Sequence, residues 1–152
     1  MSLQDTINLE KQLRLAKRAS VDVGLIGDKV GGQVYGDGQT VLQIGAIHEF
    51  GTEDIPQRSF LRVPFQMKRK EMSEFIRGEF SKIASGKRTT AKAMGRIGAK
   101  ATNIVKGAFT TKGYGTWPDI TPATKQAKGS SQPLIDTGTL RNSITWKVKD
   151  AS

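Results

Sequence analysis

Residues 41–62 read VLQIGAIHEFGTEDIPQRSFLR and combine an apolar segment, the only histidine, a glycine and a proline-containing turn. Four positions of the segment recur at helical spacing on or beside one stripe; they are Val41, Ile44, Ile47 and His48. Thr40 is placed as an N-cap, and Gly51 is placed to end the helix in a left-handed turn. The stretch therefore predicts a short buried helix between Thr40 and Gly51.

The chain after Gly51 is expected to turn and then re-enter a core. Ile55 precedes Pro56, which disfavours the α region and predicts an extended backbone. Phe60 and Leu61 form an apolar pair flanked by Arg58 and Arg62. Because arginine and aromatic residues are enriched at interface centres, this turn is interpreted as an assembly surface.

The composition indicates one domain. With 152 residues and 36% hydrophobic content, the chain is long enough for one ordinary core, so residues 1–152 are read as a single domain. Within it, residues 1–18 are expected to form a helical extension and residues 21–149 the core. There are no cysteines, which excludes disulfides and thiolate zinc sites. No apolar run approaches the ~20 residues of a membrane span, and no signal peptide is recognisable, so we expect synthesis in the cytoplasm and no membrane partner.

The positive charge belongs to the middle of the chain. The formal net charge is +10, to which residues 1–66 contribute −1, residues 67–112 contribute +9 and residues 113–152 contribute +2. Such a concentration points to an anionic neighbour, either nucleic acid or an acidic protein face. A solvated helical face is the alternative interpretation.

The first part of the chain predicts a terminal helix and a strand. Residues 2–18 carry a thin apolar stripe, which suits either loose packing on the body or docking on a neighbouring subunit. Residues 21–26 alternate as a partly buried strand. Six glycines follow between Gly24 and Gly38, but no Gly-Lys-Ser/Thr does, so residues 28–40 predict a flexible projecting loop rather than a nucleotide site. Tyr35 in this loop is a candidate contact for a partner.

Two long helices are predicted next. The first begins at Pro64, and its apolar positions have three- and four-residue spacing; they are Met72, Phe75, Ile76, Phe80 and Ile83. The second covers about residues 89–108, with small residues that allow close packing and an outer basic face. The basic surface candidates on it are Lys92, Arg96, Lys100 and Lys106. The two helices are expected to fold back as a hairpin or to cross one face of a sheet.

The C-terminal part predicts a closing strand. Trp117 is interpreted as a core plug, followed by a short helix over 123–128, a turn at 130–132, an extended segment at 133–135 and a single turn at 138–142. Residues 144–148 alternate as a strand that pairs with the 21–26 strand. The predicted fold is α+β: a small, mostly antiparallel sheet packed against two long helices, with an N-terminal helix and a glycine-rich projecting loop.

The residue inventory argues against an enzyme. One histidine and no cysteine exclude two-histidine zinc sites and Cys/His nucleophile pairs. A Ser-His-Asp set could use His48, but no Gly-x-Ser-x-Gly sequence is present. We therefore expect no catalytic residues, no metal and no cofactor, and a structural role for His48. The arginines are expected to tie turns or subunits together through carbonyls or carboxylates such as Glu49 and Asp136.

Two motifs resemble a known family. The first is His48-Glu49-Phe50-Gly51-Thr52 followed by Ile55-Pro56 and by Arg58, Phe60, Leu61 and Arg62; the second is Trp117-Pro118 followed by the run PLIDTGTLRNSI over residues 133–144. In this order they resemble the small tail-completion and virion-morphogenesis proteins, which are minor tail and neck proteins of tailed bacteriophages. The resemblance spans roughly residues 21–148.

The resemblance implies a structural virion protein of the neck or tail. It implies a homo-oligomeric ring, a hexamer or dodecamer, that connects head-completion proteins to the tail tube and lets DNA pass, with non-specific DNA contact in the channel. The candidate assembly residues are Tyr35, His48, Glu49, Arg58, Phe60, Arg62 and Arg141. The alternative function is a basic nucleic-acid-binding module, whose affinity would fall steeply with salt.

Overall fold

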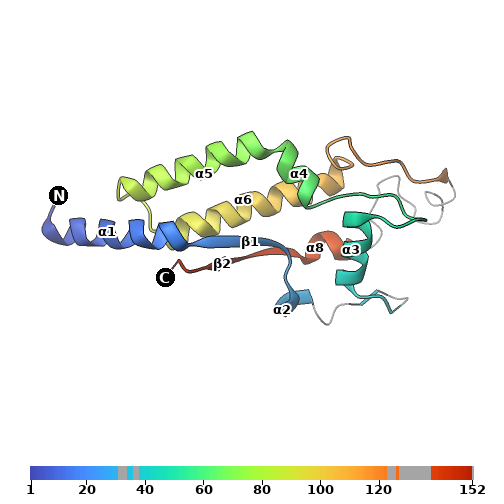
Figure 1. Ribbon diagram of the computed structural model, residues 1–152, viewed down its shortest axis with the longest axis horizontal. Coiled ribbons are helices and arrows are strands. Elements are labelled where there is room, and N and C mark those ends of the chain that lie inside the picture. Colours follow the sequence, from blue (N-terminus) through green and yellow to red (C-terminus); the bar gives the residue numbers. More distant parts are fainter. Residues whose placement is uncertain (31–33, 36–37, 123–125, 127–137, 152) are drawn as a thin grey trace.

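The computed structural model of the protein describes residues 1–30, 34–35, 38–122, 126 and 138–151 as an elongated molecule (Figure 1). The elements are α1 (Leu3–Arg18), β1 (Ser20–Leu25), α2 (Gly27–Val30), α3 (Val41–Phe50), α4 (Arg62–Met67), α5 (Arg69–Ala84), α6 (Thr90–Thr110), α8 (Thr139–Ser143) and β2 (Ile144–Lys149). Among the described residues the sheet has two antiparallel strands. The predicted α+β class is confirmed at this level.

The sheet joins the two ends of the chain, as the alternating patterns predict. β1 pairs with β2 in a register that places Val21 opposite Val148 and Val23 opposite Trp146. Because side chains alternate along a strand, these residues share one face of the sheet. That face packs on α6, where Val21 and Val148 join a cluster around Met94 and Ile97. The closing strand and its partner are therefore confirmed.

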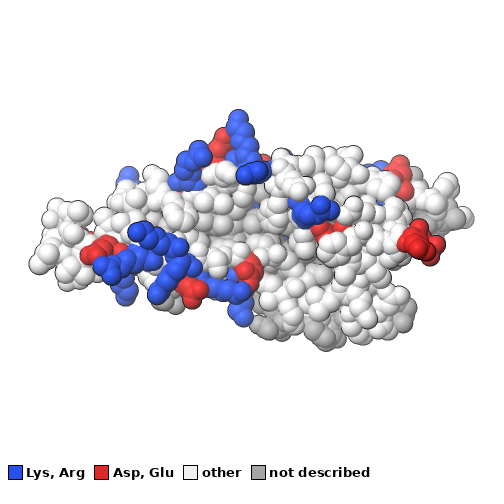
Figure 2. All heavy atoms as spheres, viewed as in Figure 1, with Lys and Arg blue, Asp and Glu red and all other residues white. Residues whose placement is uncertain are grey.

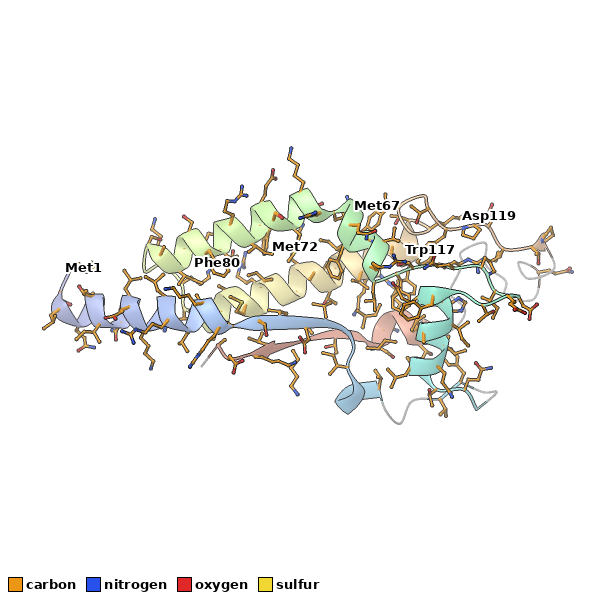
Figure 3. The ribbon with its side chains drawn as sticks, viewed as in Figure 1. Met1, Met67, Met72, Phe80, Trp117 and Asp119 are labelled. Carbon is orange, nitrogen blue, oxygen red and sulfur yellow. The ribbon has the colours of Figure 1, made fainter. Side chains whose placement is uncertain are left out.

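The two long helices form a hairpin of which only α6 lies directly on the sheet. α5 packs along α6, and Met72, Phe75 and Ile76 of α5 contact the Met94 and Ile97 cluster (Figures 1 and 3). The hairpin turns at Ser85 and Gly86, where Gly86 has a φ of 71°. The order of layers is thus sheet, α6 and α5, so the prediction that both helices lie against the sheet needs this correction.

The sequence predicts a single helix starting at Pro64, but the structure has two helices here, α4 and α5. The backbone at Lys68 leaves the helical region (φ −96°, ψ 14°) and separates α4 from α5. α4 packs against the carboxyl-terminal part of α6, whereas α5 runs back along α6 (Figure 1). The chain has to change direction between these two contacts, and the apolar periodicity of the sequence did not reveal it.

The N-terminal helix is confirmed, and only its second half is docked. Ser2 and Asp5 form a capping box at its start. Leu15 and Ala16 are buried, and the buried Thr90 donates from its backbone N–H to Gln12 Oε1 (2.7 Å) and from Oγ1 to the Gln12 carbonyl (2.8 Å). The first half of α1 extends beyond the helical hairpin (Figure 1).

The described part of the glycine-rich segment is partly ordered into secondary structure. Val30, at the end of α2, is 1% exposed, and the Tyr35 N–H donates to the Gln39 carbonyl at 2.8 Å. Tyr35 itself is half-buried against the main core, so the expectation that it is exposed is corrected, and its role as a contact for a partner stays a prediction. Residues 31–33 and 36–37 lie outside the described residues, and the flexibility of the loop stays a prediction. Apart from residue 126, the expected elements over 123–128 and 130–135 also fall outside them.

The close approach of α6 to the sheet depends on one glycine. A Cβ built on Gly98 would lie 2.2 Å from Trp146 Cδ1, near the root of the indole, whereas a Cβ on Gly95 would meet nothing within 4 Å. The predicted role of the small residues in close packing is therefore realised at Gly98 and not at Gly95.

We expect Gly98→Ala to lower the free energy of unfolding by about 1–3 kcal/mol, because the methyl group overpacks the contact with Trp146. Gly95→Ala is the matched control on the same helix. It should raise the free energy of unfolding by about 0.5–1 kcal/mol through helix propensity alone. Urea unfolding of both variants measures the difference. Equal effects of the two substitutions would show that the indole moves aside at no cost.

Candidate functional site

The helix that opens the first motif buries a stripe different from the one predicted. Within α3 the buried residues are Val41, Gly45 and Glu49, while Ile44 and His48 are half-buried beside them. A Cβ on Gly45 would lie 2.4 Å from Leu25 Cδ1, so this face packs closely on the end of β1. The helix itself, its Thr40 cap and its end at Gly51 are confirmed, but the backbone of Gly51 (φ 75°, ψ 173°) does not adopt the expected left-handed turn. Its inward face carries a carboxylate on the last turn.

The Glu49 carboxylate is the centre of the site. It is 6% exposed; Oε1 accepts from Ser59 Oγ (2.8 Å) and the Arg62 N–H (3.1 Å), and Oε2 accepts from the Phe60 and Leu61 N–H groups (both 2.9 Å). Ser59 Oγ in turn accepts from the Val63 N–H at 3.0 Å. These N–H groups belong to the start of α4 and to the two residues before it, where no helical partner exists for them. Glu49 from α3 and Ser59 from the preceding turn therefore cap α4 together.

The turn between α3 and α4 is closed on itself by further hydrogen bonds. The Arg58 N–H donates to the His48 carbonyl (2.8 Å), and Gln57 Nε2 donates to the Glu49 carbonyl (2.8 Å). A Cβ on Gly51 would lie 3.0 Å from the Gln57 backbone nitrogen, and the positive φ there also favours glycine. The glycine of the motif is thus required for the chain to return alongside the end of α3.

The second motif joins the first through Arg58 and Trp117. The guanidinium of Arg58 donates to the carbonyls of Pro118 (3.2 Å) and Asp119 (3.3 Å), and the Trp117 indole N–H donates to the Ser59 carbonyl (2.9 Å). Trp117 packs edge-on against Phe109, with ring centroids 5.6 Å apart. Trp117 and Asp119 lie at the end of the molecule opposite Met1 (Figure 3). The interpretation of Trp117 as a core residue is confirmed.

Two of the predicted assembly contacts are buried inside the subunit. Phe60 is fully buried against Phe109, with centroids 5.4 Å apart, and Arg58 is 7% exposed. Burial lowers the pKa of Arg58, and the charge of Asp119 opposes that shift. The expected surface position of Arg58 is wrong, whereas the expected return of Phe60 to a core is confirmed. A buried ring and a guanidinium on backbone carbonyls support the fold of one chain, and a role of these residues in assembly stays a prediction.

The remaining candidates surround this centre. Arg62 is exposed, His48 is half-buried, and Arg141 is half-buried on α8, which contacts α3. Glu49 was expected to pair with an arginine, and instead it accepts from backbone N–H groups and a serine. Sequence reasoning passed over Ser59. A serine just before a helix is a recognisable capping signal, and Ser59 lies three residues before the first residue of α4.

A second buried carboxylate neutralises part of the basic region. Glu79 of α5 is 1% exposed and pairs with Lys82 (3.2 Å), Arg96 (3.2 Å) and Arg88. Burial disfavours the charged form, but the hydrogen bonds from these three cations outweigh it and lower the pKa of the Glu79 carboxyl. This cluster bridges the two helices of the hairpin and was not recognised in the sequence.

The predicted basic stripe on α6 is therefore only partly available. Arg96 is bound to Glu79, and Lys100 donates to Glu71 at 2.5 Å. The hydrogen bond and charge of Lys100 lower the pKa of Glu71. Lys92 is exposed near the start of α6, and Lys106 is half-buried. Two of the four candidates thus hold the hairpin together.

The described residues contain no group of three or more histidine, cysteine, aspartate or glutamate side chains placed to hold a metal ion. In the same part of the chain, none of the helices combines the length and the apolar character that crossing a membrane requires. Among known proteins, no family model, no curated protein and no solved structure matches the chain.

We expect Glu49→Gln to lower the free energy of unfolding by about 2–4 kcal/mol, because the amide presents a donor to N–H groups that need an acceptor. Glu53→Gln is the control, since Glu53 is exposed a few residues further along the same turn. It should change stability by about 0.5 kcal/mol or less. Denaturant unfolding followed by tryptophan fluorescence gives both values. A Glu49→Gln protein as stable as the control would show that the Glu49 carboxylate is not what stabilises this turn.

The two arginines of the turn should behave differently. Arg58→Ala removes a buried side chain and leaves the Pro118 and Asp119 carbonyls without this donor, so it is expected to lower stability by about 1–3 kcal/mol. Arg62→Ala removes an exposed side chain and should change stability by about 0.5 kcal/mol or less, since the Glu49 contact uses only the Arg62 backbone. Thermal melting of both variants is the measurement. An unchanged melting temperature for Arg58→Ala would show that the Arg58 side chain does not stabilise the fold.

Proposed function

We propose that the protein is a structural component of the virion of a tailed bacteriophage, at the neck or tail-completion position. In this role, copies form a ring, a hexamer or dodecamer, between head-completion proteins and the tail tube, and DNA passes through it. The protein is made in the host cytoplasm and functions in the assembled virion. It acts by shape and contact, without a cofactor or a reaction.

The observation that carries the proposal is that the two family-like motifs meet in one hydrogen-bonded cluster. Ser59 and Trp117 are 58 residues apart in sequence, and the indole N–H of one donates to the carbonyl of the other. The most characteristic residues of the motifs, Glu49, Arg58 and Trp117, hold backbone groups rather than face a cavity. Side chains that fix a turn suit a rigid assembly component, whereas a catalytic site needs groups that reach a substrate.

The exposed parts of the same region give the proposal its contacts. Phe50 is 73% exposed directly after Glu49, and Arg62 is exposed at the start of α4. A rigid cluster that presents an exposed aromatic side chain and an arginine supports a role in protein assembly, because both types are enriched at interface centres.

The test is complementation of a phage whose copy of this gene is interrupted. We expect filled heads and separate tails without the protein, and joined particles when the wild-type chain is supplied from a plasmid. The Arg62→Ala chain should fold normally and yield fewer joined particles, whereas Glu74→Gln, at an exposed position of α5, should restore the wild-type yield. Electron microscopy counts the particles. Normal joined particles in the absence of the protein would overturn the proposal.

A second candidate function, binding of nucleic acid, is favoured by one specific feature. A groove of about 1010 Å³ lies between the first half of α1 and the turn of the helical hairpin, and four cations line it: Lys11, Lys87, Arg88 and Lys92. Phosphates bind such a groove through charge.

The salt dependence of binding separates the two functions. If the groove binds DNA, the affinity of the isolated protein falls by about 10³ or more between 50 and 200 mM salt. Lys87→Ala with Lys92→Ala should then reduce binding, and Arg69→Ala with Lys70→Ala, on exposed positions of α5, is the matched control. Fluorescence anisotropy with a short duplex measures this. Equal loss in both double variants would indicate a general charge effect rather than the groove.

A further inference from the structure

One end of the molecule carries an apolar depression with a cationic rim. On the outer face of α1, Leu3 is 79% exposed and Ile7 is 51% exposed. One turn further along lies a shallow depression of about 400 Å³, lined by Ile7, Glu10, Lys11, Arg14, Leu15 and Arg18. Figure 2 shows Lys and Arg gathered over this part of the molecule. Arg14 is paired with Glu10 at 2.5 Å, and the three cations against one carboxylate leave the rim positively charged. The depression therefore suits an apolar side chain that has anionic neighbours.

The other end carries such a side chain. α3 carries an apolar stripe on its outer face as well: Val41 and Gly45 lie inward, while Leu42, Ala46 and Phe50 are exposed at i, i+4 and i+8. Phe50 is 73% exposed, and Glu53 and Asp54 follow it as exposed carboxylates. Figure 2 shows acidic side chains at this end of the molecule. An exposed apolar stripe of this kind marks a site of interaction with another protein surface.

The two surfaces cannot meet within one chain. α1 projects at one end of the elongated molecule, and α3 lies towards the opposite end, with the helical hairpin and the sheet between them (Figure 1). A patch that is complementary to a depression elsewhere on the same molecule makes a heterologous contact between copies.

From this complementarity we infer that Phe50 of one copy seats in the α1 depression of a second copy, with Glu53 and Asp54 facing Lys11, Arg14 and Arg18. The contact is head-to-tail, so each copy uses its α1 surface for one neighbour and its α3 surface for another. This contact deepens the proposed function by naming the surfaces that join the copies. It rests on the proposed function in one respect: the closure of the copies into a ring is taken from that function. The contact itself depends only on the two surfaces.

The absence of cysteine in the wild-type chain makes directed crosslinking the sharpest test. Full-length Glu53→Cys and Arg14→Cys proteins are mixed under mild oxidation, and disulfide-linked heterodimers are quantified on a non-reducing gel. We expect at least about tenfold more heterodimer than in the mixture of Glu53→Cys with Arg69→Cys, whose cysteine lies on α5 outside both surfaces. Crosslinking of each variant with itself at the same yield as the mixture would overturn the head-to-tail arrangement.

Sedimentation tests the contributions of Phe50 and of the charged residues separately. Phe50→Asp is expected to weaken self-association at least about tenfold, and its exposed position should leave the melting temperature unchanged. Arg14→Glu and Glu53→Lys should each weaken association, and a mixture of the two single variants should restore it, because the reversed charges then face each other. Wild-type protein that sediments as a monomer at the highest attainable concentration would overturn the inference, as would association unaffected by Phe50→Asp.

The outcomes separate this contact from the proposed function. Head-to-tail crosslinks in solution together with normal joined particles in the absence of the protein would retain the contact and remove the neck or tail role. Protein found in purified virions, where the mixed cysteine variants give no crosslink above the α5 control, would retain the role and remove the contact.

Discussion

A buried carboxylate that accepts from three backbone N–H groups and one hydroxyl is the interaction on which this structure depends. Glu49 reaches from the end of α3 to the start of α4, and the burial of its charge is tolerable only because all four donors are in place. The same bonds carry Phe60 into the core beside Phe109. A polar group thus fixes where the apolar residues of the turn go.

The direction of the long hairpin follows from that constraint. With the start of α4 held at Glu49, the chain turns at Lys68 before it runs back along α6 as α5. Glu79 then bridges α5 to Arg88 and Arg96. The connection between α3 and α4 and the connection between α5 and α6 each use one buried carboxylate. Much of the positive charge of residues 67–112 therefore forms ion pairs within the molecule. The cations of α1 are more exposed than those of α6.

The sequence predicts the regular elements well because periodicity records burial. The helix with its Thr40 cap, the α5 and α6 pattern, and the pairing of the first and last strands all follow from it. It does not predict that Glu49 is on the buried face of α3, because an inward carboxylate looks like a polar position until its donors are known. The burial of Arg58 depends on Pro118 and Asp119, which are distant in sequence. Long-range hydrogen bonds of this kind leave no local pattern.

The position of Glu49 also has a mechanical consequence. Its carboxylate sits where the dipole of α3 is unfavourable to an anion and where that of α4 is favourable. If the turn opened, the charge would be left at the wrong helix end without its donors. The glycine and proline of the turn therefore do not act as a hinge, and α3 moves as one rigid unit with the body. Force applied at Phe50 would be transmitted directly into the core around Phe109 and Trp117.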